Sequence, residues 1–363
     1  MFIQKRDKGG TFLKHFLVHK LLPGMRTAKD IYANSLLLTP KGTILTEALI
    51  ASFIQHSVVS VAVEEERIMT NVSEPSFSLR DTKEFQVFKQ NFDSAFHTMQ
   101  DNINAIVQSE APIDTDALLK QTDSIFTQDM TNFRLFDMLH HMRHYDDSTY
   151  VHCINVALIC NVFGRWLELE ESEVKVLTLC GLLHDIGKLQ IPDSIIKKPG
   201  KLTENEYSII KQHPYKGYQL LQKQDLDPRI AQVALLHHER CDGTGYPMGF
   251  TSNKITDFSK IVAIADVYDA MTSARIYREG LCPFKVISML EAEGAQKYDP
   301  RFFLPFVEHT INTYLNCDVR LTNGNVGRVV FINKQNLSKP IVKVGTQCID
   351  LSKVTDLGIE SII

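Results

Sequence analysis

Seven histidine and aspartate side chains recur in one stretch of the chain, at intervals that match one helix and its return. They are His152, His184, Asp185, His213, His237, His238 and Asp266. The steps from 152 to 184, 185 to 213, 213 to 237 and 238 to 266 are 32, 28, 24 and 28 residues. Because side chains from successive helices can meet in the centre of a bundle, we expect all seven in one shared site. The spacing therefore predicts a helical domain built around a polar centre.

The donor atoms of this set predict a metal centre. All seven side chains offer nitrogen or oxygen, which suits Fe, Mn, Zn or Ni better than an ion held by thiolates. Five imidazoles and two carboxylates are too many for one catalytic ion with an open position, and about right for two ions bridged by a carboxylate. Two ions about 3.5–4 Å apart are the usual machinery for hydrolysing phosphate esters. Asp266 follows the apolar run 261–265, where an unpaired buried carboxylate would be costly, so a cationic partner is expected.

Three sequence blocks in this region resemble the HD phosphohydrolases. Residues 184–188 read HDIGK, which is similar to the signature of that superfamily. Residues 237–247 read HHERCDGTGYP and resemble the motif that names the HD-GYP subfamily, and residues 266–278 resemble its third block. The resemblance covers residues 146–314, and the three blocks stand in the subfamily's order.

The resemblance implies an activity and its cofactors. It implies a phosphodiesterase that opens cyclic di-GMP, a bacterial second messenger, to linear pGpG, which can be cut again to GMP. The seven residues match the family's metal ligands, with Asp185 as the bridge, and a hydroxide held between two cations would be the nucleophile. Iron is the first choice of metal and manganese the second. Some members hold a third ion through a glutamate four residues before the first ligand histidine; that position is Ser148 here, so two ions are expected.

Other residues match family positions that contact the substrate. Lys188 lies one helical turn beyond Asp185 and matches the lysine at the scissile phosphate, so these two are the expected catalytic residues. Arg275 and Arg278 match positions near the ligand phosphates or guanine, and a guanidinium fork suits both targets. A solvated surface arginine is the alternative for Arg278.

The glycine-rich loop at residues 243–247 is expected beside the substrate, because glycine allows a close approach. Gly245 and Tyr246 would line the groove, with the tyrosine stacking on a base; the alternative is that Tyr246 packs the loop against the helices. The resemblance also makes this loop a docking surface for diguanylate cyclases with a GGDEF domain. Glu239 and Asp269 are expected to brace the loop or orient ligands.

Two alternatives to this function stay open. The substrate could be another cyclic dinucleotide, such as cyclic GMP–AMP. The chain could also be a non-catalytic receptor for cyclic di-GMP, or a partner-docking protein, whose metals are structural. The intact ligand set argues against the non-catalytic reading, because a relic would be expected to lose some ligands.

Hydrophobic periodicity predicts a mainly α chain in four parts. Residues 1–70 form a small α+β module, and residues 71–145 a linker and helical hairpin. Residues 146–316 form the all-helical HD-type catalytic domain, and residues 317–363 a small β module. Helices are expected over residues 149–168, 172–183, 203–212, 228–238, 257–273, 283–293 and 300–314. Strands are expected over residues 31–32, 36–38, 58–63, 319–321, 326–332, 341–344 and 349–351, with a hairpin turn at 323–324.

The apolar stripe of the helical hairpin has two interpretations. Apolar residues from Phe85 to Ile106 step by three or four, and a second helix is expected from Asp114 to about Tyr145. The two helices pack on the neighbouring domain, or residues 81–145 form the contact of a homodimer; both can hold.

Composition excludes several other classes. The chain has 39 basic and 43 acidic residues, a balance of −4, which argues against a nucleic-acid polymer as partner. No run approaches the roughly 18 apolar residues of a membrane span, and no signal peptide is recognised. The seven cysteines form no CxxC pair and predict free thiols. These features favour a location in the bacterial cytoplasm.

Overall fold

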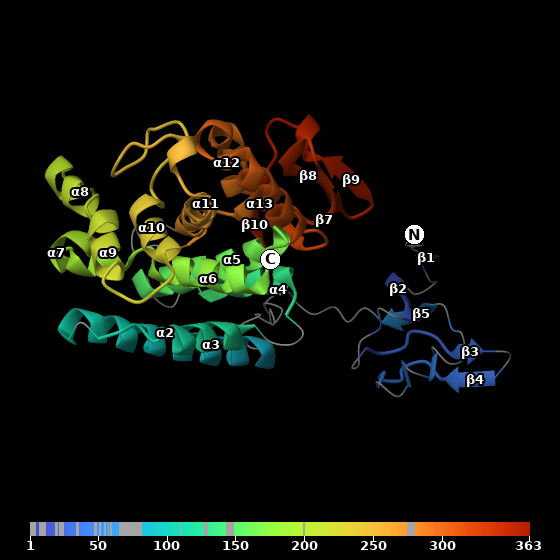
Figure 1. Cartoon of the computed structure of the whole chain (residues 1–363). Helices are drawn as coiled ribbons and strands as arrows, with labels where there is room; N and C mark the ends of the chain where they lie inside the picture. Colours follow the sequence, from blue (N-terminus) through green and yellow to red (C-terminus); the bar gives the residue numbers. More distant parts are fainter. Residues whose placement is uncertain are drawn as a thin grey trace. The chain divides into compact units, whose positions relative to one another are not determined.

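A computed structural model provides the fold of the protein. It describes residues 82–109, 111–126, 130–142, 149–198, 200–273 and 280–363, together with residues 5–6, 12–18, 21, 25–33, 36–46 and parts of 49–64. The chain divides into two compact units, Met1–Ser76 and Phe77–Ile363, which are described separately (Figure 1). The domain boundaries expected at residues 70, 145 and 316 remain predictions.

The first unit contains two small antiparallel sheets. Strands β1 (Lys5–Arg6), β2 (Phe12–Leu17) and β5 (Ser60–Glu64) form one sheet in the order β1-β2-β5. Strands β3 (Ile31–Ala33) and β4 (Leu36–Thr39) form the other. Their core is small and comprises Val18, Leu21, Ile31, Leu45, Phe53, Val61 and Val63. The strands expected in this part of the sequence are present.

Helix α2 (Lys83–Ser109) opens the second unit and buries its apolar stripe inside the same chain. The buried side chains are Phe85, Phe88, Phe92, Met99, Ile103 and Ile106. Helix α2 runs beside α3 (Thr115–Ile125), and both pack along the following helices of the unit (Figure 1). Packing on the neighbouring domain is therefore sufficient to explain the apolar stripe. The homodimer remains a prediction.

The single helix expected from Asp114 to Tyr145 is wrong. The structure has α3 and then α4 (Asn132–Met142). Helix α3 ends where Phe126 takes an extended backbone (φ −77°, ψ 105°), and the Thr131 hydroxyl accepts a hydrogen bond from the Arg134 backbone N–H at 3.3 Å. This cap starts a new helix. The break allows α3 and α4 each to bury an apolar face in the same core.

The helices that follow form the body of the second unit. Their bounds are α5 (Thr149–Trp166), α6 (Glu171–Leu183), η3 (Ile186–Gln190), α7 (Asp193–Ile196), α8 (Glu204–Ile210), α9 (His213–Leu221), α10 (Pro228–Leu236), η4 (Ser252–Lys254), α11 (Asp257–Thr272), α12 (Pro283–Lys297) and α13 (Pro300–Asn312). Helices α5 and α6 pack closely because Gly181 has no side chain; a Cβ there would lie 2.6 Å from the Ala157 Cα. The short helix α7 lies between the helices expected over 172–183 and 203–212 and was not among the expected set.

A five-stranded antiparallel sheet closes the chain. Its strands are β6 (Asp318–Leu321), β7 (Val326–Asn333), β8 (Asn336–Val344), β9 (Gln347–Asp350) and β10 (Ile359–Ile362), in the order β10-β6-β7-β8-β9. Gly324 (φ 83°) lies in the turn between β6 and β7, as the Asn-Gly pair predicts. The Glu291 carboxylate on α12 accepts from the backbone of Leu337 and Ser338 and holds β8. Strand β10 was missing from the expected set.

The mainly α fold with two flanking β-containing modules is confirmed. In the part of the chain that the structure describes, no helix has both the length and the apolar character needed to cross a membrane.

Candidate metal centre

Five helices bring the seven predicted side chains together. Helix α5 carries His152, and the end of α6 carries His184 and Asp185. His213 opens α9, His237 and His238 follow α10, and Asp266 lies within α11. Their donor atoms fall in two groups, each with all atoms within 4.8 Å of one another: Asp185, His213, His237 and His238, and then His152, His184 and Asp266. The structure therefore brings the seven side chains into one shared centre, as the spacing predicts.

The Asp185 carboxylate lies between two pairs of imidazoles. Its Oδ2 atom is 3.4 Å from Nε2 of His184 and 3.7 Å from Nε2 of His152. Its Oδ1 atom is 3.1 Å from Nε2 of His213 and 3.6 Å from Nε2 of His237. Each oxygen therefore faces its own pair of nitrogens, which is the arrangement of a carboxylate that can bridge two cations.

Asp266 also reaches both groups. Its Oδ1 atom is 3.0 Å from Nε2 of His152, and its Oδ2 atom is 3.7 Å from Nδ1 of His238. The side chain lies among apolar neighbours on α11, as the run at 261–265 indicates. Burial opposes ionisation of Asp266, but the hydrogen bond from His152 holds its pKa well below the usual range.

Backbone carbonyls orient three of the imidazoles. The Nδ1 atom of His184 lies 2.8 Å from the carbonyl of Gly181, and that of His213 lies 2.7 Å from the carbonyl of Ile210. The Nδ1 atom of His237 lies 3.0 Å from the carbonyl of Ala234. Because a carbonyl can only accept, Nδ1 carries the proton in each ring and Nε2 presents its lone pair to the centre.

A carboxylate orients His152 in the same way. Its Nδ1 atom lies 2.7 Å from Oδ2 of Asp269. Asp269 is itself held by the Asn155 amide at 3.1 Å and the Ser273 hydroxyl at 3.0 Å. Sequence reasoning expected Asp269 to orient a ligand and missed Asn155, whose only signal was its place one turn after His152. The roles of both remain predictions.

Two polar atoms at the centre have no hydrogen-bond partner. They are Nε2 of His184 and Oδ1 of Asp185, both fully buried. Such atoms are costly to leave unsatisfied. Burial lowers the pKa of His237 to about 4 and that of His238 well below its usual value, so both imidazoles keep a free lone pair at neutral pH. Neutral imidazoles, ionised carboxylates and orphaned donor atoms fit divalent cations.

Two charged contacts modify this picture. Burial opposes a charge on His152, but hydrogen bonds to Asp266 and Asp269 outweigh it and raise its pKa to about 9. A cation at Nε2 would take the place of that proton. Lys188 makes a close ion pair with Oδ2 of Asp185, and the lysine and His184 hold the pKa of that carboxyl well below its usual range despite burial.

The loop that follows His238 is fixed by one carboxylate. Glu239 is buried, and its two oxygens accept from the backbone N–H of Met248 at 2.6 Å and of Phe250 at 2.9 Å. A Cβ at Gly245 would lie 2.4 Å from the Glu239 Cα, so only glycine fits there. The Tyr246 ring lies on His238, with centroids 4.6 Å apart and planes at 31°.

Some predicted residues fall outside the described part of the chain. Arg275 and Arg278 lie there, as does Ser148, so the substrate contacts and the absence of a third ion remain predictions.

Cys153 lies closer to the centre than the sequence indicates. Its sulfur forms a third group with donor atoms of His184 and Asp185, within 4.8 Å of one another. All seven cysteines are free, as expected. Burial raises the pKa of the Cys153 thiol well above its usual value, so it stays protonated and is a poor ligand. The sequence signal for this placement is that Cys153 directly follows His152.

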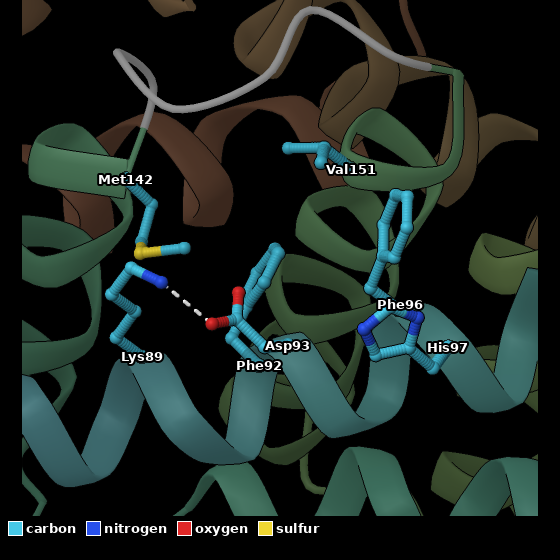
Figure 2. Close-up of a pocket in the computed structure, with 7 residues that line it drawn as sticks. All are labelled: Lys89, Phe92, Asp93, Phe96, His97, Met142 and Val151. Atoms are coloured by element: carbon cyan, nitrogen blue, oxygen red, sulfur yellow. Dashed lines mark hydrogen bonds and ion pairs between the residues drawn. The ribbon is translucent and has the colours of Figure 1, made fainter.

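A separate cavity of about 240 Å³ lies between α2, the end of α4 and the start of α5 (Figure 2). Phe92, Phe96 and His97 line it from α2, and Met142 closes it from α4. Val151, the residue before His152, also contributes. The cavity is lined by side chains that the metal centre does not use.

Comparison with protein families agrees with this geometry. Residues 130–302 match the family described as HD domain. A protein of Pseudomonas aeruginosa named cyclic di-GMP phosphodiesterase is 39% identical over 200 residues, covering 55% of this chain and 48% of that protein. A cyclic di-GMP phosphodiesterase of Thermotoga maritima is 32% identical over 219 residues, covering 58% and 59%. A 3'3'-cGAMP-specific phosphodiesterase of Vibrio cholerae is 41% identical over 167 residues, covering 46% and 39%.

A solved structure shares the fold. It is that of an HD-GYP-type protein of Bdellovibrio bacteriovorus, with a TM-score of 0.50 and 15% identity, covering 82% of this chain and 98% of that one. The match to the HD domain family covers residues 130–302. The motifs at 184–188 and 237–247 lie within this stretch and resemble those of the HD-GYP subfamily. The chain spans about half the length of the curated relatives it matches.

Proposed function

We propose that this chain is a metal-dependent phosphodiesterase that hydrolyses cyclic di-GMP to pGpG, with a second cut to GMP. The observation that carries the proposal is the Asp185 carboxylate, whose two oxygens each face a separate pair of imidazole nitrogens. A site for two cations of this kind suits phosphodiester hydrolysis. Relatives at 39% and 32% identity are named cyclic di-GMP phosphodiesterases.

The seven clustered side chains would hold two divalent ions. His213, His237 and His238 would serve one ion, His152, His184 and Asp266 the other, and Asp185 both. We infer iron as the first choice and manganese as the second, because nitrogen and oxygen donors suit both. When bound, such ions supply an activated water and neutralise charge on the phosphoryl oxygens.

The chain's own residues would position the substrate. Lys188 stays charged beside Asp185, because the carboxylates of Asp185 and Asp266 outweigh its burial and raise its pKa. Its ammonium can turn from Asp185 to a phosphate oxygen. Gly245 allows the loop backbone to approach the site, and Tyr246 offers a ring beside His238. Arg275 and Arg278 are proposed as further contacts to phosphate or guanine.

One alternative substrate has a specific basis. A relative at 41% identity is named a 3'3'-cGAMP-specific phosphodiesterase. Cyclic GMP–AMP shares the ring of two phosphodiesters and differs in one base, so the metal centre would accept either. The choice depends on residues that contact the second base.

Partners and location complete the proposal. The loop at 243–247 would dock a GGDEF-domain diguanylate cyclase, since it is presented at the surface by Glu239. Residues 81–145 would form a homodimer contact through the outer side of the hairpin. We expect the protein to act in the bacterial cytoplasm, as the free cysteines favour.

The test is anaerobic purification with elemental analysis, followed by an activity assay on the same sample. Cyclic di-GMP and cyclic GMP–AMP are supplied at equal concentration with Fe(II) or Mn(II), and products are separated by chromatography. We expect pGpG and then GMP from cyclic di-GMP. Tight binding without cleavage, at full metal occupancy, would overturn the enzymatic proposal, and faster cleavage of cyclic GMP–AMP would change the substrate.

A matched variant tests the bridge. Asp185→Ala removes the carboxylate that both groups share, so metal content should fall from about two ions per chain to below one and cleavage should disappear. Asp257→Asn, on the exposed start of α11, is the control and should keep both. Cleavage that survives in Asp185→Ala would show that the bridging role is wrong.

A further inference from the structure

The substrate proposed above is larger than the metal centre. A cyclic dinucleotide carries two bases and two phosphates, and only one phosphate can lie at the cations in each cut. The other nucleotide must contact side chains outside the cluster. This inference rests on the proposed function and asks which residues receive that second nucleotide.

Helix α8 is a rigid support beside the centre. Thr203 and Glu206 form a capping box at its start, and the Lys198 ammonium binds both Glu206 oxygens at 2.7 Å. At its end, the carbonyl of Ile210 holds the imidazole of His213 at 2.7 Å. The last turn of α8 is thereby tied directly to a predicted metal ligand.

This turn presents an aromatic ring and a cation to solvent. The Tyr207 side chain is 47% exposed. The Lys211 ammonium lies 4.9 Å from the centre of that ring and covers one of its faces. Among the described residues, Lys211 has no carboxylate partner, whereas Lys197 and Lys198 nearby are both paired with acids.

The last turn of α8 also lies close to the loop that reaches the centre. Its Ile210 carbonyl holds the His213 imidazole, and the centre of that ring is 6.5 Å from the centre of the Tyr246 ring. Tyr246 lies on His238. His213 therefore connects the rings of Tyr246 and His238 at the metal centre with the end of α8 that carries Tyr207 and Lys211.

The geometry points to Tyr207 and Lys211 as the subsite for the nucleotide that is not being cut. The open face of Tyr207 stacks on its base, and Lys211 pairs with its phosphate. Aromatic rings bind bases by stacking with little dependence on the base, and a lysine beside the ring adds a point charge for phosphate. Tyr207 and Lys211 are thus positioning residues for the dinucleotide and take no part in bond cleavage.

The experiment separates this subsite from the metal centre by using two substrates. Bis(p-nitrophenyl) phosphate is a small diester that needs the metals but has no second nucleotide. Tyr207→Ala should raise KM for cyclic di-GMP on the order of tenfold with kcat little changed, and leave the small diester unaffected. Tyr207→Phe should restore KM. Lys211→Ala should raise KM about threefold and weaken its dependence on salt.

Phe331→Ala is the matched control, since this ring is 55% exposed on β7, and it should change neither substrate. An unchanged KM in Tyr207→Ala would overturn the subsite. A parallel loss with both substrates would also overturn it, because Tyr207 would then act only by supporting His213. If the wild-type protein cleaves the small diester but not cyclic di-GMP, the proposed function fails. In that case equilibrium dialysis of cyclic di-GMP tests the subsite. Equal binding by wild type and Tyr207→Ala, or no binding by either protein, would reject it.

Discussion

Single side chains around the metal centre act mainly by fixing the orientation of others. The imidazoles of His184, His213 and His237 each use Nδ1 on a backbone carbonyl, which leaves Nε2 for the centre. His152 has no carbonyl in that position and relies on the Asp269 carboxylate. A backbone carbonyl cannot be removed by substitution, whereas a carboxylate can. Asp269 is therefore the place where orientation of a ligand can be tested.

Asp269→Asn should weaken metal binding about 10- to 100-fold, because the amide is a poorer acceptor for the His152 N–H and loses the negative charge. Competition with a chelating dye measures the affinity. Asp257→Asn on the same helix is the control, since that carboxylate is exposed and pairs with Arg301. Unchanged metal affinity in Asp269→Asn would contradict the orienting role.

At the scale of elements, the loop after α10 depends on a close backbone approach. Gly245→Ala would place a Cβ 2.4 Å from the Glu239 Cα and 2.5 Å from the Arg240 nitrogen, so the backbone must shift. We expect a loss of about 1–3 kcal/mol in the free energy of unfolding and a lower kcat/KM for the dinucleotide. Urea denaturation measures the first quantity.

Gly358→Ala is the comparison for that variant, because its nearest contact would be an ordinary 3.8 Å from Thr322. Equal stability of the two variants would show that the loop tolerates the shift, and that Gly245 has another role.

A buried ion pair joins α11 to the start of α13. The Lys260 ammonium lies 2.9 Å from the Asp299 carboxylate, and both side chains are nearly inaccessible. Hydrogen bonds from Arg301 and Lys260 outweigh burial and hold the pKa of Asp299 well below its usual value. Because folding lowers the pKa of this carboxyl, ionised Asp299 stabilises the protein fully above the pKa of the unfolded chain, near 4. The stabilisation fades as the pH falls from there through the lower pKa of the folded state.

Asp299→Asn should therefore destabilise the protein at pH 7 by about 3 kcal/mol, because buried Lys260 loses its close carboxylate and keeps only Asp257 at 3.9 Å. The difference from wild type should shrink below about pH 4, because Asp299 of the unfolded wild-type chain binds a proton there while the folded carboxyl does not. Asparagine can still cap α13, so loss of the cap does not explain the effect. Urea denaturation at pH 7 and pH 3.5 makes the comparison, and a difference independent of pH would contradict it.

At the scale of the whole molecule, the metal centre connects helices that are distant in sequence. Its side chains come from α5, α6, α9, α10 and α11, all in the second compact unit. Ions that bind only the folded state stabilise it by mass action, by about 2.7 kcal/mol at 100 times the Kd. Mn(II) should then raise the Tm by about 5–10 °C, and a chelator should reverse the shift. Calorimetry of wild type and Asp185→Ala tests this, and an equal shift in the variant would contradict it.

The sequence by itself determined which donor side chains, motifs and secondary structure elements could be predicted. Local patterns suffice for a ligand set with helical spacing, an Asn-Gly turn and apolar stripes, because each depends on residues close in the chain. Thus the seven donors, the mainly α fold and the HD-GYP motifs could be predicted. The break between α3 and α4 and the strand β10 could not, because both depend on which distant surface is available for packing.

Only the tertiary structure decided how the side chains face one another. The two oxygens of Asp185 point to different imidazole pairs, Asn155 holds Asp269, and the Tyr246 ring lies 6.5 Å from that of His213. These contacts join residues more than 30 positions apart or depend on the rotation of a ring about one bond. Spacing along a chain predicts which helix carries a side chain and roughly which face it occupies. The direction of a lone pair is set by the hydrogen-bond partner, and that partner arrives only when the helices have packed.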